Sequence, residues 1–155
     1  DSEGGDIGLY QLTFDAEEVL LETGKTPREL NWTWYIYEHD GAGTIIGPTL
    51  GDGTWDPDTG KVTITFSTEV AILSGDTMNL VLTAPVSFTS SVDTSSLTMR
   101  LANDVEFEPV AAASAVERGI VWNDRSNSSH SFDTDDWTNS YTLDYLPADY
   151  FTATE

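Results

Sequence analysis

Alternation of apolar and polar residues with a period of two dominates this chain and recurs in most windows along it. Successive side chains of a β-strand point to opposite faces of a sheet, so the period predicts strands with one buried and one solvent-facing side. In each clear run we expect the apolar residues to share the buried face. These residues are Tyr10, Leu12 and Phe14; Val62, Ile64 and Phe66; Met78, Leu80, Leu82 and Ala84; Leu97, Met99 and Leu101; and Val105 and Phe107.

Turn sequences separate these runs at short intervals. The stretch from Asp56 to Gly60 combines a proline, which fixes φ, with a glycine that accepts positive φ, and Asp40-Gly41 and Ser74-Gly75-Asp76 have similar chemistry. Turns this frequent indicate short strands that pair with their neighbours in sequence. Residues 1–155 are therefore predicted to form one all-β domain, a single antiparallel β-sandwich of the immunoglobulin-like kind with about seven to ten strands.

Three segments fit this scheme less clearly. Residues 15–24 hold Asp15 and Glu18 at the spacing of a capping box and end in glycine, which favours one or two helical turns. A strand with alternating apolar residues fits the same stretch equally well, so both interpretations stay open. Residues 111–118 are also ambiguous, with an extended conformation favoured, and residues 85–97 are polar enough for a long crossover between sheets.

Charge and composition exclude several classes of function. Six Lys and Arg against 27 Asp and Glu give a net charge of -21, which makes nucleic acid and anionic membranes poor partners. No apolar run approaches the length of about 20 residues needed to insert into a bilayer. Such acidity favours an extracellular or cell-surface location in a saline or calcium-rich medium, although it also keeps any surface protein soluble. The start at Asp1, without methionine or signal peptide, indicates a processed chain or a piece of a longer one.

Reactive residues are scarce, and the sequence predicts no enzyme and no required cofactor. The chain has no cysteine, which excludes disulfides, thiol catalysis and cysteine-bound metals. Its two histidines, His39 and His130, have no partner at metal-ligand spacing, and no nucleophile elbow accompanies them. The many carboxylates fall in turns or on the polar phase of strands, which is typical of a solvated surface rather than a glycosidase pair.

Calcium is the one ion for which the sequence offers candidate ligands, because hard cations prefer carboxylate and carbonyl oxygens. None of the acidic loops has the spacing of a helix-loop-helix calcium site, and an ordinary turn is the favoured interpretation of each. The candidate ligands are Asp52, Asp56 and Asp58 in one loop, Asp124 in a second, and Asp133, Asp135 and Asp136 in a third.

Aromatic residues allow two interpretations. Trp32 and Trp34 lie on one face of a predicted strand and, with Trp55, are candidates for a platform that stacks on glycan rings. A central strand of a sandwich would bury them instead, and burial is favoured. Asn31 and Asn127 each begin an N-glycosylation pattern, which is short and occurs often by chance.

The closing part of the chain holds a string that strand alternation does not require. It comprises Trp122-Asn123-Asp124-Arg125-Ser126, then His130-Ser131, then Asp136-Trp137-Thr138-Asn139-Ser140-Tyr141, and Leu146-Pro147. This string resembles the closing segment of β-sandwich modules in prokaryotic cell-surface and S-layer-type proteins, and residues 5–14 resemble their opening strand. The resemblance implies a structural or adhesive role, with Trp122 and Trp137 holding the last strands together.

These observations together predict a non-catalytic extracellular module, a subunit of a surface layer or filament that assembles with copies of itself or with other surface proteins. An N-terminal strand within residues 1–15 is a candidate for donation to a neighbour's sheet edge. The alternatives are a carbohydrate-binding or adhesin module with glycan partners and a decoration protein of a viral capsid. The residues of the candidate assembly strand are Ile7, Leu9, Tyr10, Leu12 and Phe14.

Overall fold

The computed structural model describes residues 5–20, 32–56, 58–85, 95–102, 109–110, 119–127, 129–138 and 151–154. Within these ranges every regular element is a β-strand and every strand pair is antiparallel, so the predicted all-β antiparallel fold is confirmed. The strands are β1 (Ile7–Leu20), β2 (Trp34–His39), β3 (Ile45–Asp56), β4 (Lys61–Ile72), β5 (Asn79–Thr83), β6 (Ser95–Leu101), β7 (Pro109–Val110), β8 (Ile120–Asn123), β9 (Trp137–Thr138) and β10 (Phe151–Thr154).

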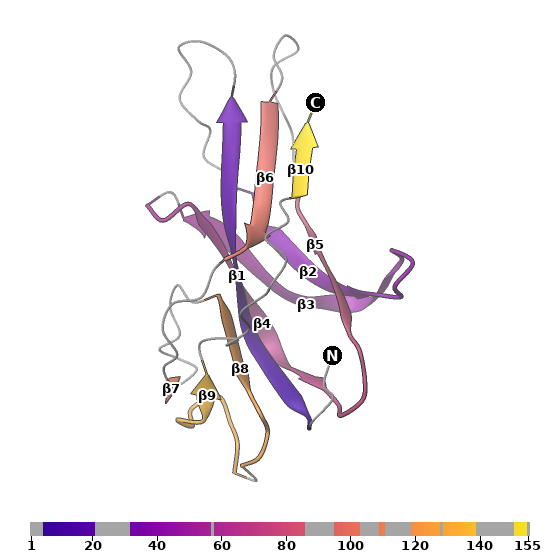
Figure 1. Cartoon of the computed structure of the whole chain (residues 1–155), viewed down its shortest axis with the longest axis vertical. Helices are drawn as coiled ribbons and strands as arrows, with labels where there is room; N and C mark the ends of the chain where they lie inside the picture. Colours follow the sequence, from indigo (N-terminus) through magenta and orange to yellow (C-terminus); the bar gives the residue numbers. More distant parts are fainter. Residues whose placement is uncertain are drawn as a thin grey trace.

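The strands follow the order β5-β2-β3-β4-β1-β8-β9-β7, and β6 and β10 branch from this path at β1 (Figure 1). β1 is long enough, at 14 residues, to pair both with strands of the main path and with β6. Its first half pairs with β4 on one edge and β8 on the other, whereas residues 14–20 pair with β6. β1 therefore joins the main sheet to the β6–β10 pair.

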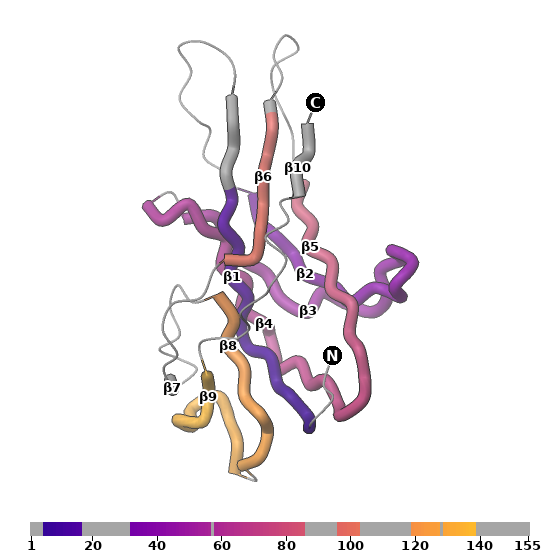
Figure 2. Tube along the Cα trace, viewed as in Figure 1, coloured from indigo at the N-terminus to yellow at the C-terminus, as the bar shows by residue number. Residues whose placement is uncertain are grey.

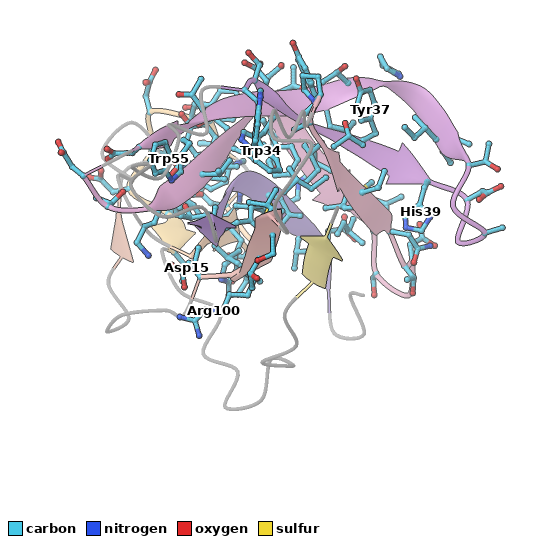
Figure 3. The ribbon with its side chains drawn as sticks, turned by 90° about the horizontal axis from the view of Figure 1, so that it is seen from above. Asp15, Trp34, Tyr37, His39, Trp55 and Arg100 are labelled. Carbon is cyan, nitrogen blue, oxygen red and sulfur yellow. The ribbon has the colours of Figure 1, made fainter. Side chains whose placement is uncertain are left out.

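The main core lies on one face of β1 and β4. Its buried side chains come from four strands, and Leu97 of β6 belongs to the same cluster as Trp34 of β2. The β6–β10 pair and the β2–β3 pair lie on different sides of β1, an arrangement that is consistent with the predicted sandwich (Figures 1 and 3). The buried members of this cluster are Leu9, Leu12, Ala16, Trp34, Ile36, Val62, Ile64, Phe66, Val70, Ile72 and Leu97.

A β-bulge in β1 corrects one prediction from the alternation. Leu12 and Phe14 contact the main core as expected, but Tyr10 contacts a second cluster instead. The register of β1 shifts between Leu9 and Gln11 against both β4 and β8. The extra residue of a bulge breaks the period of two, which sends Tyr10 to the opposite face.

The second cluster consists of Val121 and Trp137, both fully buried, with Tyr10 packed against them. The Tyr10 and Trp137 ring centroids lie 5.5 Å apart, and Phe132 adds a ring 5.3 Å from Tyr10. Trp122, the neighbour of Val121, points the other way and packs against the main core. Trp122 and Trp137 thus pack on opposite faces of the sheet at β8, Trp122 in the main core and Trp137 in the second cluster.

The described residues resolve one of the open interpretations. Residues 15–20 continue β1 as a strand, so no helix begins at Asp15. The predicted turns occur around Gly41, Gly60 and Gly75, which have φ values of 80°, 69° and 85°. Positive φ is unfavourable for residues with a Cβ, which explains glycine at these positions. The predictions for Val105 and Phe107, for residues 111–118 and for 86–94 lie outside the described residues.

Candidate functional site

The opening and closing segments of the chain, although far apart in sequence, lie side by side. β8 pairs with the first half of β1, with Gly8 opposite Asn123 and Leu9 opposite Trp122 (Figure 2). Beside this pair, polar side chains from β4, β8 and the segment between β8 and β9 meet around one histidine. We call this group the His130 network, and its members are Glu69, Asn123, Arg125, His130 and Asp136.

Both ring nitrogens of His130 have protein partners. Nδ1 lies 2.9 Å from Asp136 Oδ2, and Nε2 lies 3.2 Å from Glu69 Oε2 and 3.1 Å from Asn123 Nδ2. The His130 side chain is only 10% exposed. The ring therefore joins β4, β8 and the following loop at a single point.

The amide of Asn123 has a fixed orientation in this network. Its Oδ1 accepts a hydrogen bond from the backbone N of Arg125 at 2.8 Å, which leaves Nδ2 facing His130 Nε2. A neutral ring with its proton on Nδ1 donates to Asp136 and accepts from Asn123, whereas a protonated ring donates to Asp136 and Glu69. The contact with Asn123 Nδ2 thus uses Nε2 as an acceptor, whereas the contact with Glu69 uses it as a donor.

Arg125 connects the loop to β4 through Glu69. Its Nε lies 3.1 Å from Glu69 Oε1, a buried oxygen that receives no well-aligned hydrogen bond from the described residues. Arg125 and Glu69 thus form an ion pair whose geometry is not that of a hydrogen bond. Arg125 also has a φ of 50°, in the left-handed region, which costs a residue with a side chain about 1 kcal/mol. The bond from its backbone N to Asn123 helps to hold this conformation.

Gly8 provides the space that the network occupies. A Cβ at this position would overlap the carboxylate of Glu69 and would lie 2.8 Å from Asn123 Nδ2. Sequence reasoning missed both Gly8 and Glu69 as site residues, because Glu69 falls on the polar phase of a strand, where a solvated side chain is the ordinary expectation. The only available signal was the position of Gly8 inside the opening segment that resembles surface modules.

The pKa of Asp136, at the Nδ1 edge of the His130 ring, is lowered. The hydrogen bond from Thr134 Oγ1 to Asp136 Oδ1, at 2.6 Å, lowers the pKa of Asp136, and the contact with His130 lowers it further against the opposing effect of burial. Thr134 Oγ1 also lies 2.7 Å from the backbone O of Ser131, so its one proton is shared between Asp136 and this carbonyl, which also accepts from Trp137 Nε1 at 3.2 Å. The loop is thereby tied to the second cluster.

The arrangement around His130 does not resemble a catalytic triad. The ring packs on Trp137 with centroids 4.8 Å apart, and its two nitrogens face Asp136, Glu69 and Asn123. Among the described residues no serine hydroxyl contacts either nitrogen, although a triad requires one there. The network joins segments of the chain rather than presenting a free base.

A second ionic cluster lies where β1 passes from β4 to β6. Asp15 contacts Lys61 Nζ and Arg100 Nε, each at 2.8 Å, and Figure 3 shows Asp15 and Arg100 on the side of the molecule away from Tyr37. Burial raises the pKa of Asp15, but the hydrogen bonds and charges of Lys61 and Arg100 outweigh it and hold the pKa below its ordinary value. The cluster connects β1, β4 and β6.

Two of the candidate calcium ligands, Asp56 and Asp124, accept hydrogen bonds in their own turns. Asp56 accepts from Asp58 N at 2.9 Å and from Thr59 Oγ1 at 3.1 Å. Asp124 accepts from Ser126 N, which with the Ser126 side chain lowers the pKa of Asp124. Within the described ranges no three acidic or histidine side chains converge in a way that could hold a metal ion. Of the remaining candidates, Asp136 contacts His130. The others, Asp52, Asp58, Asp133 and Asp135, are exposed.

The candidate glycan platform is divided by burial. Trp34 is only 3% exposed and belongs to the main core, as the favoured interpretation predicted, whereas Trp32 and Trp55 are partly buried at its margin. The indole Nε1 atoms of Trp34 and Trp55 are buried and have no hydrogen-bond partner among the described residues. Of the two glycosylation candidates, Asn127 is exposed, and Asn31 lies outside the described residues.

The candidate assembly strand lies in the middle of the sheet. β1 contains Ile7, Leu9, Leu12 and Phe14, and both of its edges are paired with strands of the same chain over most of this stretch. Donation to a neighbour would therefore require β1 to leave its own sheet and its core contacts. Sheet ends are better placed than β1 to meet another molecule.

Comparisons of the chain with protein-family models, with curated proteins and with solved structures gave no match. No helix within the described ranges is long and apolar enough to cross a membrane.

Proposed function

We propose that this chain is a non-catalytic, immunoglobulin-like structural module that works outside the cell, as a subunit of a surface layer or filament assembled through sheet edges. The resemblance of its opening and closing segments to prokaryotic cell-surface modules supports the location. The net charge of -21 supports a saline or calcium-rich exterior, where ions reduce the repulsion between copies.

The observation that carries the proposal is the use of the ionisable side chains. Both nitrogens of His130 contact groups of the same chain, and Asp15 is held between Lys61 and Arg100. An enzyme keeps an acid or base within reach of its substrate. Here the same chemistry links strands that are distant in sequence, which favours a mechanical role.

The test is the size and shape of the particles that the purified chain forms. Light scattering and electron microscopy would be performed at low and high salt, each with calcium and with a chelator. We expect ordered filaments or sheets, favoured by high salt, and a requirement for calcium would assign ions to the acidic loops. A monomer under all four conditions would contradict the proposal.

If the chain is monomeric, glycan binding becomes the favoured function, as the main alternative. Trp34 is too deeply buried to stack on a sugar, so that function would depend on the partly buried Trp32 and Trp55. Quenching of tryptophan fluorescence by added glycans would support it. A viral decoration protein, the remaining alternative, would instead bind to purified capsids.

A further inference from the structure

The end strand β5 lacks the features that usually protect a sheet edge. Within the described part of the chain β5 pairs with β2 alone, so its other edge presents main-chain donors and acceptors without a partner strand. Proteins normally guard such edges with charged residues, proline or a bulge. The sequence Asn79-Leu80-Val81-Leu82-Thr83 has no charge and no proline, and its register with β2 has no shift.

Among the described residues, three other strand segments with an open side carry protective features, whereas β10 (Phe151–Thr154), which pairs with β6 alone, is uncharged but shorter than β5. The first part of β3 contains Gly47, with a φ of 77°, followed by Pro48, which has no backbone N–H. The second part of β4 carries Glu69 of the His130 network, and β7 begins with Pro109. β5 is therefore less protected than these three segments and offers a longer edge than β10.

Between this edge and Asp52 of β3, which lies opposite Tyr35, the sheet face carries four uncharged side chains. Val81 lies opposite Tyr37 of β2, and Thr83 lies opposite Tyr35. The two tyrosine rings are 6.5 Å apart and partly exposed, and neither contacts the main core cluster. The absence of charge on these four residues lowers the local like-charge repulsion between two copies of a chain with a net charge of -21.

We infer that β5 pairs antiparallel with β5 of a second copy, with Val81 opposite the same residue of that copy. In this register Leu80 faces Leu82 and Asn79 faces Thr83, so every cross-strand pair is uncharged. The contact is two-fold symmetric and closes at two copies, leaving any extension of the assembly to other surfaces. The inference rests on the proposed function, because it identifies one of the contacts through which the module assembles.

Cross-linking tests this register directly, because the natural chain has no cysteine. Opposed residues in antiparallel strands have Cα atoms about 4.5 to 5.5 Å apart, within the range that a disulfide spans. V81C is expected to form a disulfide-linked dimer under mild oxidation. T65C is the matched control, because Thr65 is exposed on the central strand β4 and should stay unlinked. Equal cross-linking of the two variants would overturn the inference.

A charge placed at the symmetry point tests the same contact without covalent trapping. V81K puts two lysines opposite each other and should weaken self-association roughly fivefold or more in sedimentation experiments at 1 M NaCl. T65K adds the same charge away from the edge and should associate as the natural chain does. Circular dichroism checks that each variant is folded, and V81T provides an uncharged substitution at the edge.

The outcomes separate this inference from the proposed function. Larger assemblies that persist in V81K, without cross-linking of V81C, would overturn the β5 contact and leave the proposed function standing. A closed dimer that cross-links at V81C but never grows would keep the β5 contact and contradict the extended assembly. A natural chain that stays monomeric, with V81C unlinked, would overturn both.

Discussion

The two faces of β1 are built in different ways. On one face Leu9, Leu12 and Ala16 enter a large core shared by several strands. The other face holds a small cluster formed by Val121, Trp137 and Tyr10, beside the polar His130 network. The ion pairs of Asp15 also lie on this face. The large core depends on apolar volume that many side chains supply, whereas the small cluster depends on individual residues with fixed partners.

This difference leads us to expect unequal tolerance to substitution. Hydrophobic cores accept changes that conserve volume at a modest cost. A polar network has no such freedom, because removal of one member leaves another buried group without its partner. The following experiments test the contrast.

Loss of Trp137 should have the largest effect. The residue is fully buried, contacts Tyr10 and His130, and donates to Ser131 O. We expect W137A to lower the free energy of unfolding by about 4 kcal/mol, measured by urea denaturation. W137F keeps a ring but not the donor and should cost about 1 to 2 kcal/mol. Equal losses in the two variants would contradict this assignment.

Addition of a methyl group at Gly8 should have the next largest effect. The new Cβ would overlap the Glu69 carboxylate, which is held by Arg125 and His130. G8A is expected to lower the free energy of unfolding by about 2 kcal/mol. G5A is the matched control, because a Cβ at Gly5 meets nothing within 4 Å. A neutral G8A would show that Glu69 moves away at little cost.

In the large core, a volume change of one methyl group should cost less. Ile64 is fully buried, and we expect I64V to lower the free energy of unfolding by about 1 kcal/mol. If I64V destabilises the protein more than G8A does, the contrast between the two faces of β1 is wrong.

Acid should weaken the polar side of β1, through Asp15 and Asp136, which both lie outside the large core. The pKa of each carboxyl group is lowered in the folded state. Each group therefore stabilises the fold above the ordinary carboxyl pKa of about 4, and this stabilisation is lost as the pH falls through the folded pKa. D15N and D136N remove the titrating group. Each variant should therefore lose less stability than the natural chain between pH 6 and pH 3, measured by urea midpoints. An unchanged pH dependence in both would refute the linkage.

The smallest effect is expected at Thr134. T134A removes the hydroxyl that donates to Asp136, which should cost about 1 kcal/mol or less. It should also move the pKa of Asp136 upward, toward the ordinary value, because that hydrogen bond is the leading cause of the lowered pKa. Carboxyl titration by NMR measures this shift, and an unchanged pKa would show that other groups hold the charge.

The large core was predictable because its information is local. Val62, Ile64 and Phe66 alternate in sequence and all three are buried. The prediction was wrong at Tyr10, where a bulge adds a residue and reverses the face, and alternation alone contains no signal for that insertion. The stretch after Asp15 stayed ambiguous, since its capping pattern suits a helix while pairing with β6 makes it a strand.

The His130 network was only partly predictable. Asn123, Arg125, His130 and Asp136 belong to one string, which marked that segment as unusual without giving their partners. Glu69 and Gly8 reach them through strand pairing across much of the chain, and no local pattern encodes that contact. The edge strand β5 is a similar case, because its pattern predicts a strand but not its place at the end of the sheet.

The strand β1, which both groups of strands share, affects how the molecule unfolds. Its first half is hydrogen-bonded to β4 and β8 and its last part to β6, so the two groups of strands share one continuous strand and meet at Phe14 and Asp15. Unfolding should then be a single cooperative event, with the slowest amide exchange in β1. In a layer under tension, such a chain would hold its full length until it yields all at once.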